Sequence, residues 1–183
     1  MNLPNKITLF RVCVIPVFLY CYLAEPFGRT AGWGLALALF AAASLSDWLD
    51  GYIARRCGLI TNFGKLMDPL ADKMLVSAAM IAMTQTGILP AWAVVVMVSR
   101  ELFISGYRQL ALERGLVLAA SFWAKSKTVV QLAMILYLLL PVDLSRSASA
   151  GALKWGLVGA SVALSLVSAA EYVYKNPFVL QGE

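Results

Sequence analysis

The stretch Asp47-Trp48-Leu49-Asp50-Gly51-Tyr52-Ile53-Ala54-Arg55, followed after eight residues by Gly64 and then by Asp68 and Asp72, joins two strongly apolar segments. It holds four of the chain's ten acidic residues within 26 positions. On a helix, Asp47 and Asp50 would share one face, and Asp68 and Asp72 would share another. Carboxylates at membrane depth are costly and are usually functional. Two such pairs facing each other predict a cage of oxygen ligands.

The composition of the chain is that of a membrane protein. It has 183 residues, of which 61% are hydrophobic and 14% are charged, so a single membrane domain over residues 1–183 is expected. The net charge of +5 comes from basic residues scattered between apolar runs. This scatter favours anionic lipid or a phosphorylated substrate as a partner and argues against nucleic acid.

The chain contains no histidine, which removes the commonest general base and the commonest zinc ligand. Its three cysteines, Cys13, Cys21 and Cys57, lack CxxC spacing and are interpreted as small buried apolar residues. Acid–base chemistry is therefore left to carboxylates, lysine, tyrosine or cysteine.

Apolar runs separated by turn residues predict an all-α integral membrane protein with six transmembrane helices. The first is interpreted as an uncleaved helix, because Pro16 interrupts its apolar region and no clear cleavage site follows. Asp68-Pro69 is typical of an N-cap followed by proline, so the third helix is expected to begin there or slightly earlier. The second helix is expected to cover Thr30 to Ser46 and the first part of the Asp stretch, before a polar connection from Arg55 to Lys65. The other expected helices are 1–24, about Asp68 to Gly87, Pro90 to Leu112, Ser121 to Leu140, and Ala152 to Tyr174.

Six helices place both termini on one side of the membrane. Twelve of the lysines and arginines fall on that side, against Arg29, Arg146 and Lys154 on the other. The positive-inside rule therefore predicts cytoplasmic termini, with the Asp stretch and the basic region from Arg108 to Lys127 on the same face.

Four converging carboxylates would repel one another unless cations compensate them. Oxygen ligands without nearby cysteine or histidine favour Mg²⁺ or Mn²⁺, and two ions roughly 3.5 to 4 Å apart would form the clamp used for displacement at phosphorus. Gly51 and Ala54 would leave room for a ligand, although helix packing alone also explains them. Arg55 could pair with a phosphate.

The ordered set of eight residues resembles the signature of the CDP-alcohol phosphatidyltransferase family, D-x2-D-G-x2-A-R-x8-G-x3-D-x3-D, without departure. The resemblance implies a six-helix, homodimeric bacterial enzyme of the inner membrane. Such an enzyme moves a phosphatidyl group from CDP-diacylglycerol to an alcohol and releases CMP, with its active site on the cytoplasmic side.

The resemblance also implies roles for individual residues. The implied metal ligands are Asp47, Asp50, Asp68 and Asp72, and Asp72 would also be the general base toward the acceptor hydroxyl. The residues implied to bind CDP are Gly51, Ala54, Arg55 and Gly64. Asn5 and Thr8 join them because the opening segment up to Arg11 is also similar to the family, although a helix cap explains Asn5 nearly as well.

The acceptor must be chosen outside the Asp stretch, because the family shares that motif across acceptors. Segments around Arg100, Arg108 and Lys125 to Gln131 are similar to those of the bacterial members that make phosphatidylglycerophosphate. Binding of the glycerol 3-phosphate phosphate group is therefore expected at Arg100, Arg108, Lys125 and Lys127.

Several alternatives stay open at this point. These cations could instead serve membrane topology or contact lipid headgroups. The acceptor could be phosphatidylglycerol, giving cardiolipin, or it could be serine or inositol phosphate. A more distant alternative is a divalent-cation transporter that uses the same carboxylates.

Overall fold

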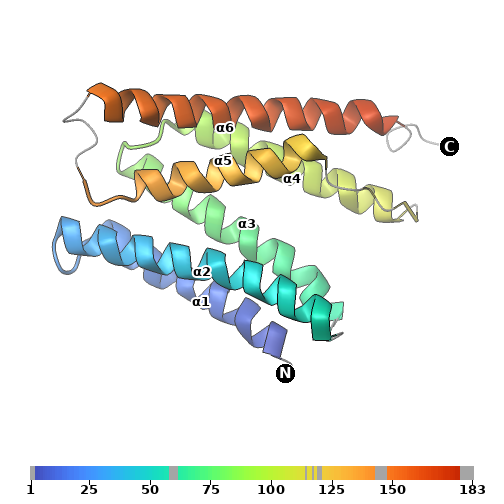
Figure 1. The fold of residues 1–183 in the computed structure, drawn as a ribbon, viewed down its shortest axis with the longest axis horizontal. Coiled ribbons are helices and arrows are strands. Elements are labelled where there is room, and N and C mark those ends of the chain that lie inside the picture. Colours follow the sequence, from blue (N-terminus) through green and yellow to red (C-terminus); the bar gives the residue numbers. More distant parts are fainter. Residues whose placement is uncertain are drawn as a thin grey trace. The chain divides into compact units, whose positions relative to one another are not determined.

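The computed structural model describes residues 3–57, 62–113, 115–116, 118, 121–142 and 148–177, and the side chains of 3–8, 47–57 and 62–69 are outside that description. Within these ranges the chain forms helices and no strands (Figure 1). The helices are α1 (Leu3–Ala24), α2 (Arg29–Cys57), α3 (Asn62–Gln85), α4 (Ala91–Glu113), α5 (Phe122–Leu138) and α6 (Ala148–Lys175). For the residues that the structure describes, the prediction of six helices and no strands is confirmed.

The turns between α1 and α2 and between α3 and α4 lie where the sequence predicts them. Between α1 and α2, Glu25 and Gly28 have φ values of 47° and 84°, and the Gly28 N–H donates to the Glu25 carbonyl at 2.8 Å. After α3, Gly87 has a φ of 72° and its N–H donates to the Thr84 carbonyl at 3.1 Å. Glycine adopts these left-handed conformations without the steric cost that a side chain brings.

The start of α3 differs from the prediction. The helix begins at Asn62, so Asp68 is not its N-cap and Pro69 lies within it. An internal proline removes one helical hydrogen bond, but apolar helices packed against neighbours tolerate it. The first helix likewise continues through Pro16. The cap-and-proline signal at Asp68-Pro69 therefore placed the start of α3 too late.

Packing divides the chain into two compact units. The first comprises Met1–Ile88 and Leu136–Asp143, and the second comprises Leu89–Ile135 and Leu144–Glu183. The expectation of a single domain over the whole chain stays a prediction.

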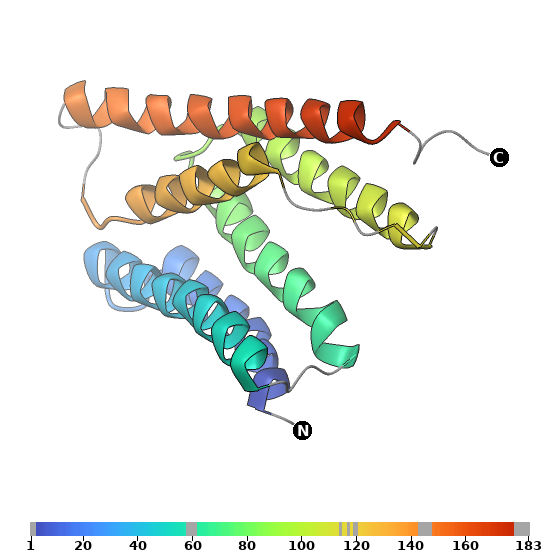
Figure 2. The same cartoon turned by 45° about the vertical axis from the view of Figure 1, so that its right-hand side comes forward.

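In the first unit, α1 packs against both α2 and α3, and Figure 2 shows α1 and α2 running side by side. Phe18 is buried at the centre of this packing, with its ring centroid 5.9 Å from that of Tyr22 and 6.0 Å from that of Phe40. The Tyr22 hydroxyl lies 2.9 Å from the Thr86 hydroxyl, which ties α1 to the chain just after α3. Aromatic contacts between α1 and α2, and one partly buried hydrogen bond from α1 to the end of α3, thus hold the helices that carry the Asp stretch.

In the second unit, α4 packs against α6. Ile104, Tyr107 and Ala111 on α4 form a buried cluster with Tyr172 on α6. The Tyr107 hydroxyl donates to the Asn176 carbonyl, and the Asn176 amide donates to the Tyr172 carbonyl at 2.8 Å. These contacts fix the C-terminal end of α6 against α4.

Among the described residues, α6 is the one helix that is both long and apolar enough to cross a membrane by length and composition. Other helices carry large exposed apolar side chains, such as Phe10 and Tyr20 on α1 and Leu102 and Phe103 on α4. Exposed apolar surface of this extent suits contact with lipid. Six membrane spans and cytoplasmic termini stay predictions.

Candidate active site

The two acidic pairs of the Asp stretch lie on two helices of the first unit that contact each other. Asp47 and Asp50 are near the C-terminal end of α2, and Asp68 and Asp72 are in the first half of α3. Since both segments are helical, each pair keeps the spacing that puts its members on one face. The backbone therefore provides the helical framework that the sequence predicts for a carboxylate cage.

Asp72 is the one signature residue whose side chain the structure describes. Asp72 is half-buried on α3. The predicted roles of the others stay predictions, because these residues lie outside the described side chains: Asp47, Asp50, Gly51, Ala54, Arg55, Gly64 and Asp68, together with Asn5 and Thr8.

Among the described side chains, no group of three or more His, Cys, Asp or Glu residues could hold a metal ion. Three of the four predicted ligands, Asp47, Asp50 and Asp68, are not among the described side chains. Its donor chemistry, four carboxylates on two contacting helices, fits a hard divalent ion such as Mg²⁺ or Mn²⁺.

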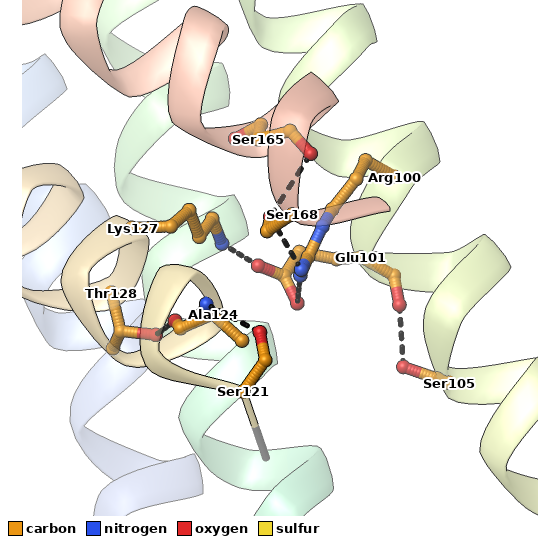
Figure 3. Close-up of polar contacts among 9 residues, drawn as sticks. All are labelled: Arg100, Glu101, Ser105, Ser121, Ala124, Lys127, Thr128, Ser165 and Ser168. Carbon is orange, nitrogen blue, oxygen red and sulfur yellow. Dashed lines mark hydrogen bonds and ion pairs between the residues drawn. The ribbon is translucent and has the colours of Figure 1, made fainter. Parts of the chain in front are cut away.

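A second polar site is assembled in the second unit from α4, α5 and α6 (Figure 3). Glu101 contacts two cations through its two carboxylate oxygens: Oε2 lies 3.6 Å from Arg100 Nη1, and Oε1 forms an ion pair with Lys127 Nζ. The exposed fractions of the side chains are 8% for Arg100, 3% for Lys127 and 18% for Glu101. We call Arg100, Glu101, Lys127 and Ser168 the cation cluster.

Helix α6 contributes the uncharged member of the cation cluster. Arg100 Nη2 donates to Ser168 Oγ at 2.8 Å, and Ser168 Oγ donates to the Ser165 carbonyl at 3.1 Å. Ser161, Ser165 and Ser168 are fully buried and follow the spacing of one helix face. Sequence analysis missed these serines, although three serines on one face of an otherwise apolar helix were a readable signal.

The two lysines of α5 differ in burial. Ser121 caps the helix, because its Oγ accepts the Ala124 N–H at 3.2 Å. Residues two apart on a helix do not share a face. Accordingly, Lys127 is buried and Lys125 is exposed.

Of the four residues predicted to bind the acceptor phosphate, the structure brings together Arg100 and Lys127. Arg108 and Lys125 are exposed, and Arg108 Nη2 donates to the Leu118 carbonyl at 3.4 Å. The phosphate-binding role of all four stays a prediction.

The cation cluster contains two positive groups and one negative group. Arginine presents a planar fork of N–H donors that matches phosphate and carboxylate oxygens, and lysine adds a compact positive charge. A buried site of this kind can bind an anion that offers at least two oxygens.

The chain belongs to the CDP-alcohol phosphatidyltransferase family, whose sequence profile matches residues 1–167. The family predicted from the Asp stretch is confirmed.

Individual relatives have names that specify an acceptor. A Bacillus subtilis protein named CDP-diacylglycerol–glycerol-3-phosphate 3-phosphatidyltransferase is 43% identical over 191 residues, covering 96% of this chain and 95% of that protein. A Mycobacterium tuberculosis protein named probable phosphatidylglycerophosphate synthase is 35% identical over 172 residues, covering 94% and 80%. A Mycoplasma pneumoniae protein with the same name as the Bacillus protein is 32% identical, covering 96% and 88%.

Proposed function

We propose that this chain is an integral membrane enzyme that transfers the phosphatidyl group of CDP-diacylglycerol to glycerol 3-phosphate. The products are phosphatidylglycerophosphate and CMP. The observation that carries the proposal is the 43% identity, over 96% of the chain, to a Bacillus protein named for this reaction. The complete signature of the Asp stretch supports the same conclusion.

The chemistry assigned to the chain is a displacement at phosphorus. Asp72 accepts the proton of the acceptor hydroxyl, and the hydroxyl oxygen forms a bond to the β-phosphorus of CDP-diacylglycerol. The bond between that phosphorus and the oxygen bridging to the α-phosphate breaks, and CMP leaves with the electron pair. A positioned carboxylate is one of the bases that a chain without histidine can supply.

The remaining signature residues hold the donor substrate. Asp47, Asp50, Asp68 and Asp72 would bind two Mg²⁺ or Mn²⁺ ions, which supply positive charge for the attacking and leaving oxygens when bound. Arg55 would pair with the diphosphate, while small residues let it approach the backbone. The proposed CDP-binding set is Gly51, Ala54, Arg55 and Gly64, with Asn5 and Thr8.

The acceptor phosphate is assigned to the basic residues of the second unit. Arg100 and Lys127 would contact the phosphate directly, because burial strengthens their electrostatic interaction with an anion. Arg108 and Lys125 are exposed and would contribute a weaker, salt-screened attraction.

The setting that we propose is the inner membrane of a bacterium, with six spans and the active site on the cytoplasmic side. Distribution of lysine and arginine supports the orientation, and exposed apolar side chains support contact with membrane lipids. A homodimer is proposed from family resemblance alone.

The test is a CMP-release assay on purified protein with CDP-diacylglycerol and a panel of acceptors. Glycerol 3-phosphate is expected to give the fastest release. Faster release with phosphatidylglycerol, serine or inositol phosphate would keep the chemistry and replace the acceptor. Flux of divalent metal into proteoliposomes without CMP production would instead indicate a transporter.

A further inference from the structure

We propose that Glu171 on α6 binds the hydroxyl on carbon 2 of the acceptor, and so distinguishes glycerol 3-phosphate from phosphate esters that lack this hydroxyl. Glycerol 3-phosphate has a second hydroxyl at the end of its chain, which is the less hindered nucleophile and is assigned to Asp72. The hydroxyl on carbon 2 needs a hydrogen-bond acceptor of its own. The inference rests on the proposed function, because it takes the acceptor phosphate to lie at Arg100.

The first support is the environment of the Glu171 carboxylate. The side chain is 17% exposed, and its Oε1 accepts a hydrogen bond from Lys175 Nζ at 2.7 Å. Its other oxygen, Oε2, is buried and accepts no hydrogen bond from any residue that the structure describes. Burial of a carboxylate oxygen without a donor is costly, and an ion pair with a largely exposed lysine offsets little of that cost. A hydroxyl that donates to Oε2 would remove it.

The second support is the other charged group of this unit with a buried atom that lacks a partner. Arg100 Nε is a buried donor with no hydrogen-bond partner among the described residues. It matches an anionic oxygen, whereas Glu171 Oε2 matches a hydroxyl. One ligand with a phosphate and a hydroxyl would therefore satisfy both atoms. Three uncharged hydroxyls of α6 also lack partners, but their burial costs less than that of a charged group: Ser161, Ser165 and Tyr172.

The third support is the position of Glu171 relative to the cation cluster. Arg100 Nη2 donates to Ser168 Oγ at 2.8 Å. Ser168 and Glu171 are three residues apart, so they share a face of α6 with an offset of about 4.5 Å along the helix axis. Ser121, which caps α5, lies close to the Glu171 carboxylate, so Glu171 also faces the helix that carries Lys127.

The shape of glycerol 3-phosphate suits this arrangement. Its carbon 2 is bonded directly to the carbon that bears the phosphate ester. A phosphate held by Arg100 therefore leaves the hydroxyl on carbon 2 within reach of the next turn of α6, where Glu171 lies.

The experiment compares glycerol 3-phosphate with 3-hydroxypropyl phosphate, which keeps the phosphate and the terminal hydroxyl but lacks the hydroxyl on carbon 2. We define the acceptor ratio as kcat/KM for glycerol 3-phosphate divided by kcat/KM for 3-hydroxypropyl phosphate, both measured by CMP release. In the unaltered protein the acceptor ratio is expected to be roughly 10 to 100, because the second compound loses a hydrogen bond to a charged group. An acceptor ratio near one would overturn the proposal.

Glu171→Ala is expected to lower the acceptor ratio to about three or less, while kcat/KM for 3-hydroxypropyl phosphate stays within about twofold. A purely structural role would lower kcat/KM for both compounds alike and leave the ratio unchanged. Lys175→Ala is the matched control, because it removes the ion pair of Glu171 and keeps the carboxylate. It should keep the original ratio. An unchanged ratio in folded Glu171→Ala protein, or an equal fall in Lys175→Ala, would overturn the proposal.

Folding of the variants is checked by their melting temperatures. If Glu171→Ala does not fold, Glu171→Gln carries the test, because it keeps the size of the side chain. Its neutral amide oxygen accepts a weaker hydrogen bond than a carboxylate, so the acceptor ratio is expected to fall about threefold. An unchanged ratio in Glu171→Gln would then overturn the proposal.

Calorimetric binding of both compounds to the purified protein, without CDP-diacylglycerol, separates this inference from the proposed function. Suppose that no CMP is released with glycerol 3-phosphate, but that it binds more tightly than 3-hydroxypropyl phosphate and loses this advantage in Glu171→Ala. The proposed function then fails and hydroxyl binding by Glu171 stands. If CMP is released and the acceptor ratio does not change in Glu171→Ala, hydroxyl binding by Glu171 fails and the function stands.

Discussion

The Asp stretch and the cation cluster differ in how the chain builds them. The Asp stretch places eight signature positions within 26 residues, and helical spacing alone pairs its carboxylates. The cation cluster joins Arg100 and Glu101 on α4 to Lys127 on α5 and Ser168 on α6, so packing must bring distant segments together. Under the proposed roles, the residues of the reaction are specified by local sequence, whereas the residues that would bind the acceptor are brought together by the packing of three helices.

This comparison predicts that changes in the Asp stretch abolish turnover, while changes in the cation cluster alter affinity for one substrate. The largest effect is expected for Asp72→Asn, which removes the base. CMP release should fall by about 10²- to 10⁴-fold, with Mn²⁺ binding partly kept by the other carboxylates. Single-turnover CMP release measures the effect, and near-normal turnover would remove Asp72 as the base.

The next largest effect is expected for Arg100→Ala. It should raise the KM for glycerol 3-phosphate by roughly 10- to 100-fold, because a buried charged contact to the phosphate is lost. The KM for CDP-diacylglycerol should change by about twofold or less. Arg108→Ala serves as the comparison: its exposure predicts a rise in acceptor KM of about threefold. An unchanged acceptor KM in folded Arg100→Ala protein would return Arg100 to a structural role.

The smallest effect is expected for Ser168→Ala, which removes the anchor of Arg100. The acceptor KM should rise by about fivefold while kcat stays within about twofold, because one hydrogen bond to a charged group is lost. Ser168→Thr keeps the hydroxyl and should restore the KM. Ser161→Ala, in the same buried row of serines, should leave both constants unchanged. Equal effects of Ser161→Ala and Ser168→Ala would contradict a positioning role for Ser168.

Much of the fold was predictable because apolar runs and turn residues act locally. The turns at Glu25–Gly28 and Gly87–Pro90 separate helices as predicted. The predicted start of α3 was too late, because a cap-and-proline signal carries no information about contacts that keep the preceding residues helical. The helix α6 begins at Ala148, four residues before the predicted Ala152.

The site was predictable to the extent that its residues are close in sequence. The Asp stretch could be read directly from the sequence. Lys125 and Lys127 were both predicted to bind the acceptor phosphate, although residues two apart on a helix do not share a face. The link from Glu101 to Lys127 depends on α4 meeting α5, which no local pattern encodes. Ser165 and Ser168 resemble the small residues common in packed membrane helices. Their hydrogen bonds, from Arg100 to Ser168 and from Ser168 to the Ser165 carbonyl, could therefore not be predicted from the sequence.

The central claim is that the chain transfers a phosphatidyl group to glycerol 3-phosphate, and CMP release across acceptors tests it most directly. With CDP-diacylglycerol and Mg²⁺ or Mn²⁺, the purified protein should release CMP at least about tenfold faster with glycerol 3-phosphate than with phosphatidylglycerol, serine or inositol phosphate. Removal of the metal by a chelator should stop release. Release that is equally fast with a neutral or singly charged acceptor, or absent with glycerol 3-phosphate, would contradict the account.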